Sequence, residues 1–105
     1  MLTMTWKDKA AITVITTTAR IKLLKTLNVD ANSILLKKMK YLFAFWEIDM
    51  ICSKETRLAR VKKFLDLLTS KMTTSLFMKF INSLDEEDFS RELLEAYAKE
   101  GGYIT

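Results

Sequence analysis

Three apolar stripes at helical spacing follow one another between residues 54 and 97. Within each stripe the apolar residues step by three or four positions, so each set falls on one side of a helix with 3.6 residues per turn. The stripes are Leu58, Val61, Leu65 and Leu68; then Leu76, Phe77, Phe80, Ile81 and Leu84; then Phe89, Leu93, Leu94 and Tyr97. Only short polar breaks separate them, so the pattern predicts three helices that fold back on one another.

The first third of the chain is ambiguous. Residues 12–18 form a β-branched run rich in threonine, and residue propensity alone favours a strand there. Helical spacing fits as well, with one face made by Ala10, Val14, Thr18 (or Thr17), Ile21 and Leu24. A lone strand would leave its backbone without hydrogen-bond partners. We therefore predict a helix over residues 6–26 that is bent or interrupted within the threonines.

Polar residues suited to helix N-caps separate the remaining apolar segments. We expect a second helix over about residues 33–41, a third over about residues 44–52, and three more over the stripes. The expected caps, in chain order, are Asn32 or Ser33, then Ser53, then Thr73 or Thr74, and finally Ser83 or Asp85. Gly101 is expected to end the last helix. The sequence thus predicts an all-α fold, a six-helix antiparallel bundle in one domain over residues 1–105.

The composition favours helices and offers little catalytic chemistry. The 105 residues include no proline and no histidine, and the two glycines are adjacent. A β-rich domain of this length would need turn residues at many hairpins. Cys52 is the only cysteine, so no disulfide can form within the chain, which fits a reducing, cytoplasmic location. Without a histidine partner for a nucleophile, we expect no enzyme activity, and no cofactor or metal.

Charge is distributed unevenly along the chain. Residues 1–40 carry eight Lys or Arg and two Asp, a net +6, and residues 41–84 carry seven basic and four acidic groups, a net +3. Residues 85–105 carry two basic and seven acidic groups, a net −5. A molecule with this polarity can attract copies of itself. No apolar run approaches the roughly 18 to 20 residues of a membrane span.

A small basic domain that binds nucleic acid is the alternative to a domain that binds another protein or a copy of itself. Lys37, Lys38 and Lys40 form a dense basic run that could neutralise phosphates. The aromatic residues that follow are Tyr41, Phe43, Phe45 and Trp46. We expect them to pack in the core rather than to form an exposed platform on which bases stack. We therefore expect solvated lysines, and nucleic-acid binding is the less favoured prediction.

Two stretches resemble the caspase recruitment domain (CARD) of the death-fold superfamily. Residues 42–52, LFAFWEIDMIC, resemble the family's short third helix and its entry. Residues 60–68, RVKKFLDLL, resemble its fourth-helix pattern R-x-x-x-L-L-D-x-L, and Phe77 and Phe80 fall where the fifth helix has its core. The chain departs from the family at Met72, where a glycine is usual, and in its threonine-rich first helix.

The resemblance implies homotypic binding to another CARD or to a second copy, often in helical oligomers, in apoptotic or innate-immune signalling. A basic surface on the first and fourth helices of the family typically meets an acidic surface on the second and third helices of the next molecule. The basic residues carried over are Arg20, Lys22, Lys25, Arg57, Arg60 and Lys63. The acidic residues are Glu47 and Asp49, with a richer cluster at Asp85, Glu86, Glu87 and Asp88 that is expected to cap the last helix rather than bind a cation. Reversing Arg60 and Lys63 to Glu is expected to abolish assembly and to leave helicity intact.

Overall fold

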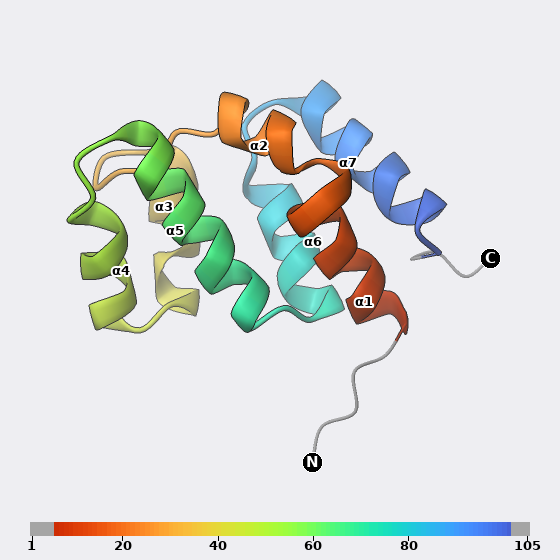
Figure 1. Ribbon diagram of the computed structural model, residues 1–105, viewed down its shortest axis with the longest axis horizontal. Coiled ribbons are helices and arrows are strands. Elements are labelled where there is room, and N and C mark those ends of the chain that lie inside the picture. Colours follow the sequence, from red (N-terminus) through yellow and green to blue (C-terminus); the bar gives the residue numbers. More distant parts are fainter. Residues whose placement is uncertain (1–5, 102–105) are drawn as a thin grey trace, which may run out of the picture.

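Seven α-helices make up the part of the chain that the computed structural model describes, residues 6–101 with side chains from residue 8 (Figure 1). They are α1 (Trp6–Thr13), α2 (Arg20–Thr26), α3 (Ile34–Met39), α4 (Phe45–Cys52), α5 (Arg57–Ser70), α6 (Thr74–Ser83) and α7 (Glu87–Lys99). A π-helical turn, η1 (Val14–Thr18), joins α1 to α2, and a 3-10 turn, η2 (Lys40–Leu42), follows α3. No strand occurs within residues 6–101, and the prediction of an all-α fold is confirmed.

The threonine-rich run is helical, and the predicted interruption is the π turn. The Ala19 N–H donates to the carbonyl of Val14, five residues earlier, at 2.9 Å. The hydroxyls of Thr13 and Thr16 donate to carbonyls four residues earlier, a bond that often bends helices. Val14 and Ile15 are fully buried, so tertiary packing has overridden the strand propensity of this run.

The core draws on every helix, and the three predicted stripes line it. Phe64 lies within it, with ring centroids 5.5 Å from Phe43 and 6.0 Å from Phe80. The stripes are buried or half-buried except for Leu58, which is 44% exposed. The largest fully buried side chains are Phe64, Phe77, Phe80, Ile15, Leu23, Met39, Ile51, Leu65, Leu68, Ile81 and Leu93.

Two of the predicted helix caps are confirmed. The Ser33 hydroxyl accepts from the N–H of Leu36 at 3.3 Å, and the Thr73 hydroxyl accepts from the N–H of Leu76 at 3.0 Å. Beyond α7, Gly101 has φ of +89°, the left-handed conformation expected after the last helix.

Two other caps were predicted wrongly. Helix α5 is capped by Thr56, whose hydroxyl accepts from the N–H of Ala59 at 3.0 Å, and not by Ser53. Ser53 instead closes α4, donating its N–H to the carbonyl of Asp49. The residue before α7 is Glu86, one position beyond Asp85, and its side chain makes no capping bond.

The helices are arranged so that α4 and α7 lie at opposite ends of the molecule (Figure 1). Helix α2 runs beside α5. Arg20 at the start of α2 pairs with Asp66 in the second half of α5, and carbonyls at the end of α2 accept from Arg57 at the start of α5. The two helices are therefore antiparallel neighbours. None of the helices within residues 6–101 has the length and apolar character needed to cross a membrane.

Candidate interaction surfaces

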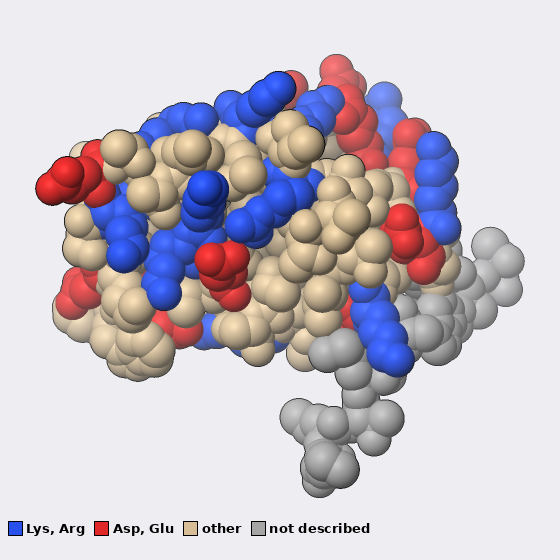
Figure 2. All heavy atoms as spheres, in the orientation of Figure 1, with Lys and Arg blue, Asp and Glu red and all other residues tan. Residues whose placement is uncertain are grey.

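Lys and Arg side chains gather over α2 and α5, as Figure 2 shows. The predicted basic residues lie on these two helices, so the fold brings together two segments far apart in sequence. Their side chains do not all remain available to a partner, however. Four of the six make hydrogen bonds or ion pairs within the molecule, and these are Arg20, Lys22, Arg57 and Arg60.

Arg57 donates hydrogen bonds to carbonyl groups at the carboxyl end of α2. Its Nη1 donates to the carbonyl oxygens of Leu24 and Leu27, at 2.9 and 2.7 Å. These carbonyls have no partner in a following helical turn, and a cation there also interacts favourably with the helix dipole. Arg57 is thus part of the fold, although its side chain is exposed.

Arg60 joins two loops that sequence analysis could not place together. Its Nε donates to the carbonyl of Val29 at 2.9 Å, in the loop after α2. Its Nη1 donates to the carbonyls of Lys54 and Glu55, at 3.1 and 3.3 Å, in the loop before α5. Reversal of Arg60 would take the donor from three backbone acceptors, so we expect it to lower stability, and the expectation that helicity stays intact remains a prediction.

Ion pairs occupy Arg20 and Lys22. Arg20 Nη2 lies 3.3 Å from Asp66 Oδ1, and Lys22 pairs with Glu92 on α7. Both Lys22 and Glu92 are about half exposed, so this pair is screened by water and contributes little to stability.

An exposed apolar side chain lies on the same helix as part of the remaining basic surface. Ile21 is 69% exposed on α2, and Lys25 lies one helical turn further on, also exposed. Lys63 lies along α5 between the residues that contact α2, Arg57 and Asp66. Within residues 8–101, neither Lys25 nor Lys63 has an ion pair or hydrogen bond through its side chain. We call Ile21, Lys25 and Lys63 the α2–α5 surface.

The acidic surface predicted on the third helix is wrong for one of its two members. Glu47 is 5% exposed, while Asp49 is on the surface. Glu47 Oε1 accepts from the N–H of Ala44 at 2.7 Å and forms an ion pair with Lys71. Burial by itself would raise the pKa of Glu47. The hydrogen bonds from Lys71 and Ala44 and the charge of Lys71 outweigh burial and lower the pKa below its ordinary value.

The other predicted acidic residues lie at the start of α7 and are all exposed. Glu87 and Asp88 are in its first turn, and Asp88 lies 3.7 Å from Arg91. Negative charges at this position favour the helix dipole, as predicted. No cluster of acidic, cysteine or histidine residues within the described chain could hold a metal ion.

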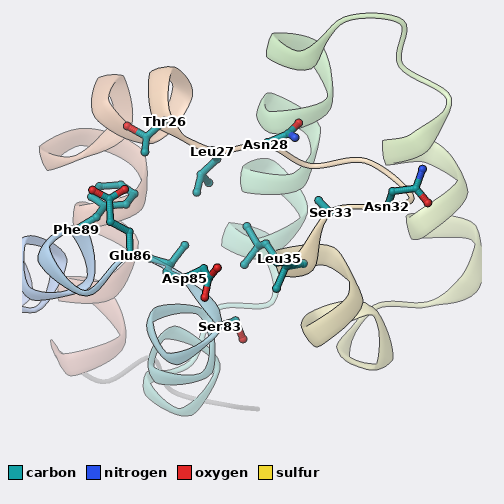
Figure 3. A pocket seen from close by; sticks show the side chains of 12 residues that line it. Thr26, Leu27, Asn28, Asn32, Ser33, Leu35, Ser83, Asp85, Glu86 and Phe89 are labelled. Carbon is teal, nitrogen blue, oxygen red and sulfur yellow. The ribbon is translucent and has the colours of Figure 1, made fainter.

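A cavity of about 490 Å³ opens beside this acidic turn (Figure 3). We call it the α3–α7 pocket. It is lined by Thr26, Leu27, Asn28, Asn32, Ser33, Ile34, Leu35, Ser83, Leu84, Asp85, Glu86 and Phe89. Figure 3 shows Phe89 and Glu86 on one side of the space and Ser33 and Leu35 on the other. The pocket is therefore lined both by apolar side chains and by the acidic residues Asp85 and Glu86.

The aromatic residues around η2 depart most from expectation. Phe43 is buried, as predicted, but Tyr41, Phe45 and Trp46 are 71%, 82% and 60% exposed. On α4, Glu47 and Ile51 face the core, and a residue two positions away on a helix points to the opposite side. Phe45 therefore faces solvent. We call Tyr41, Phe45 and Trp46 the aromatic surface.

Exposed lysines lie around the aromatic surface. Lys37, Lys38 and Lys40 precede it on α3 and η2, and all three are exposed, as predicted. Lys79 on α6 places its Nζ 5.8 Å from the centroid of the Tyr41 ring, within reach of a cation–π interaction. Helix α6 thus contributes a fourth lysine to this end of the molecule.

Cys52 is half-buried. Burial raises the pKa of its thiol, the carboxylates of Asp30 and Asp49 raise it further, and Arg60 opposes them. A thiol with a raised pKa is a weak nucleophile at neutral pH.

No family model, curated protein or solved structure matches the chain. The resemblance to the caspase recruitment domain therefore stays a prediction carried by the residues quoted for it.

Proposed function

We propose that the chain is a protein-interaction module of the CARD type, which recruits a matching domain and has no chemistry of its own. The order of elements supports this proposal. With α1, η1 and α2 counted as one bent helix, residues 6–101 hold six helices, the number in a death-fold bundle. Cytoplasmic apoptotic or innate-immune signalling is proposed on the resemblance alone.

The observation that carries the proposal is the exposure of Ile21 one helical turn before the exposed Lys25, with the half-buried Lys63 on the neighbouring helix α5. An apolar side chain that is 69% exposed is suited to become buried at an interface. Lys25 and Lys63 would orient a partner and raise its rate of encounter, while the apolar contact would hold it. We propose that the α2–α5 surface docks onto the acidic surface of a partner CARD.

Binding titrations against a panel of purified CARDs with acidic second and third helices test this proposal. We expect at least one member to bind, more weakly at 300 mM than at 50 mM salt, because screening weakens exposed charge pairs. Both K25E/K63E and I21A should weaken that binding by at least about ten-fold. The matched control is K9E/K54E, which reverses two exposed lysines elsewhere. Equal binding by K25E/K63E and the control would reject this surface.

A further inference from the structure

The aromatic surface is an unusual concentration of exposed apolar area. Its three large rings fall within six consecutive residues, and Phe45 alone is 82% exposed. Clustered exposed apolar side chains on a small domain mark a site that another molecule covers. Tyr and Trp are also the residues that most often anchor protein interfaces.

The surroundings of the aromatic surface are positively charged. Lys37, Lys38, Lys40 and Lys79 are all exposed there. On α3, η2, α4 and α6 the only exposed acidic residue is Asp49, because Glu47 is buried against Lys71. The covering molecule should therefore present an apolar recess with negative charge at its edge.

The α3–α7 pocket has this chemistry. Its lining includes the buried side chains of Leu27, Leu35 and Phe89, and the exposed carboxylates of Asp85 and Glu86 lie beside them. Its volume of about 490 Å³ falls in the range of pockets that enclose a small organic group, so an aromatic side chain can enter.

The pocket and the aromatic surface lie at opposite ends of α3. Ser33, Ile34 and Leu35 at the start of this helix line the pocket, whereas Tyr41 follows its end. One copy therefore cannot fill its own pocket with its own aromatic residues. A contact between the aromatic surface and the pocket would therefore join two molecules, each using a different patch.

We infer that the aromatic surface of one copy inserts into the α3–α7 pocket of a second copy, with lysines facing Asp85 and Glu86. The inference rests on the proposed function as an interaction module and adds a self-assembly contact separate from the α2–α5 surface. A nucleic acid could stack on the aromatic rings and pair with the lysines, but it would leave the acidic pocket without a role. A second copy accounts for both features.

Light scattering with size-exclusion chromatography, across concentration, tests the contact with two variants. F45A/W46A removes the inserted rings, and D85K/E86K reverses the edge of the pocket. The wild type should assemble as concentration rises, and each variant should need at least about ten-fold higher concentration. The control L58A, which shortens an exposed leucine elsewhere, should behave as the wild type.

Mixing the two variants gives the decisive measurement. F45A/W46A keeps an intact pocket and D85K/E86K keeps intact aromatic residues, so together they should form a one-to-one complex that neither forms alone. Circular dichroism checks that both are folded, and D85N/E86Q serves as the pocket variant if D85K/E86K unfolds. Failure of the two folded variants to combine would overturn the inference.

Two further outcomes would also overturn it. One is assembly of F45A/W46A at wild-type concentrations. The other is a wild type that stays monomeric yet binds an oligo(dT) probe in a salt-sensitive way that F45A/W46A loses, which would assign the aromatic surface to nucleic acid. F45A/W46A should still bind the CARD panel through the α2–α5 surface, so the two proposals fail separately.

Discussion

Lys71 forms an ion pair with the buried carboxylate of Glu47, a residue 24 positions earlier in the chain. The pair ties the residue after α5 to the first turn of α4. Lys71 Nζ also lies 4.7 Å from the centroid of the Phe43 ring, so the ammonium group lies over an aromatic side chain of the core. Glu47 in turn holds the N–H of Ala44, at the start of α4.

Removing the cation of this pair should destabilise the protein. K71M leaves a buried carboxylate without its counter-charge, and we expect a loss of about 2 kcal/mol in the free energy of unfolding at pH 7. E47Q keeps an oxygen for the Ala44 N–H and should lose less. Urea denaturation followed by circular dichroism measures both values. Equal stability of K71M and the wild type would show that the pair contributes nothing.

The same pair makes stability depend on acid pH. The pKa of Glu47 is lower in the folded state than its ordinary value, so the ionised carboxylate stabilises the fold above the ordinary glutamate pKa of about 4.3. This contribution is lost as pH falls through that value toward the lowered pKa of the folded state. The difference in unfolding free energy between wild type and E47Q should therefore shrink between pH 7 and pH 3. A constant difference would contradict the assignment.

The guanidinium of Arg60 should matter for stability and not only for binding. R60A removes the donor for three loop carbonyls, and we expect a loss of about 2 kcal/mol in the free energy of unfolding. R60K should recover only part of it, because an ammonium cannot reproduce the planar donor geometry. The control K63A removes a neighbouring lysine without such bonds and should change stability by less than about 0.5 kcal/mol. Chemical denaturation would refute this role if R60A were as stable as K63A.

The two possible caps of α5 can be distinguished by matched substitutions. T56A removes the acceptor for the N–H of Ala59, and we expect a loss of about 1 kcal/mol. The Ser53 hydroxyl donates to the carbonyl of Met50 on the surface, so S53A should change stability by less than about 0.5 kcal/mol. Thermal unfolding compares the two variants. A larger loss in S53A would place the start of α5 at the earlier residue.

The predictions from sequence were most successful where burial repeats with the helical period. The stripes after residue 57 needed only local spacing to be recognised, and the threonine run could be assigned to a helix because no strand partner was available. The caps were harder, because Ser53 and Thr56 are both suitable residues. The length of α4 decides between them, since Ser53 is used to close that helix.

The roles of charged and aromatic side chains depended on distant contacts. The buried Glu47 pairs with Lys71, and the half-buried Arg60 donates to two loops that meet beside it. Residues 41–46 are almost wholly apolar, so no polar position marks which side of this segment faces water. The only sign in the sequence that part of this segment is exposed is the closeness of its aromatic residues. A short helix cannot bury adjacent aromatic residues on one face.

Two phenylalanines should show the contrast between core and surface. Phe64 is fully buried between two aromatic rings, and F64A should cost about 3 to 5 kcal/mol because it leaves a cavity. F45A shortens a side chain that is 82% exposed and should change the stability of the monomer by less than about 0.5 kcal/mol. Urea denaturation at low protein concentration measures both, because assembly would add to the apparent stability. A loss of several kcal/mol in F45A under these conditions would mean that Phe45 packs within its own copy and is not free to enter another.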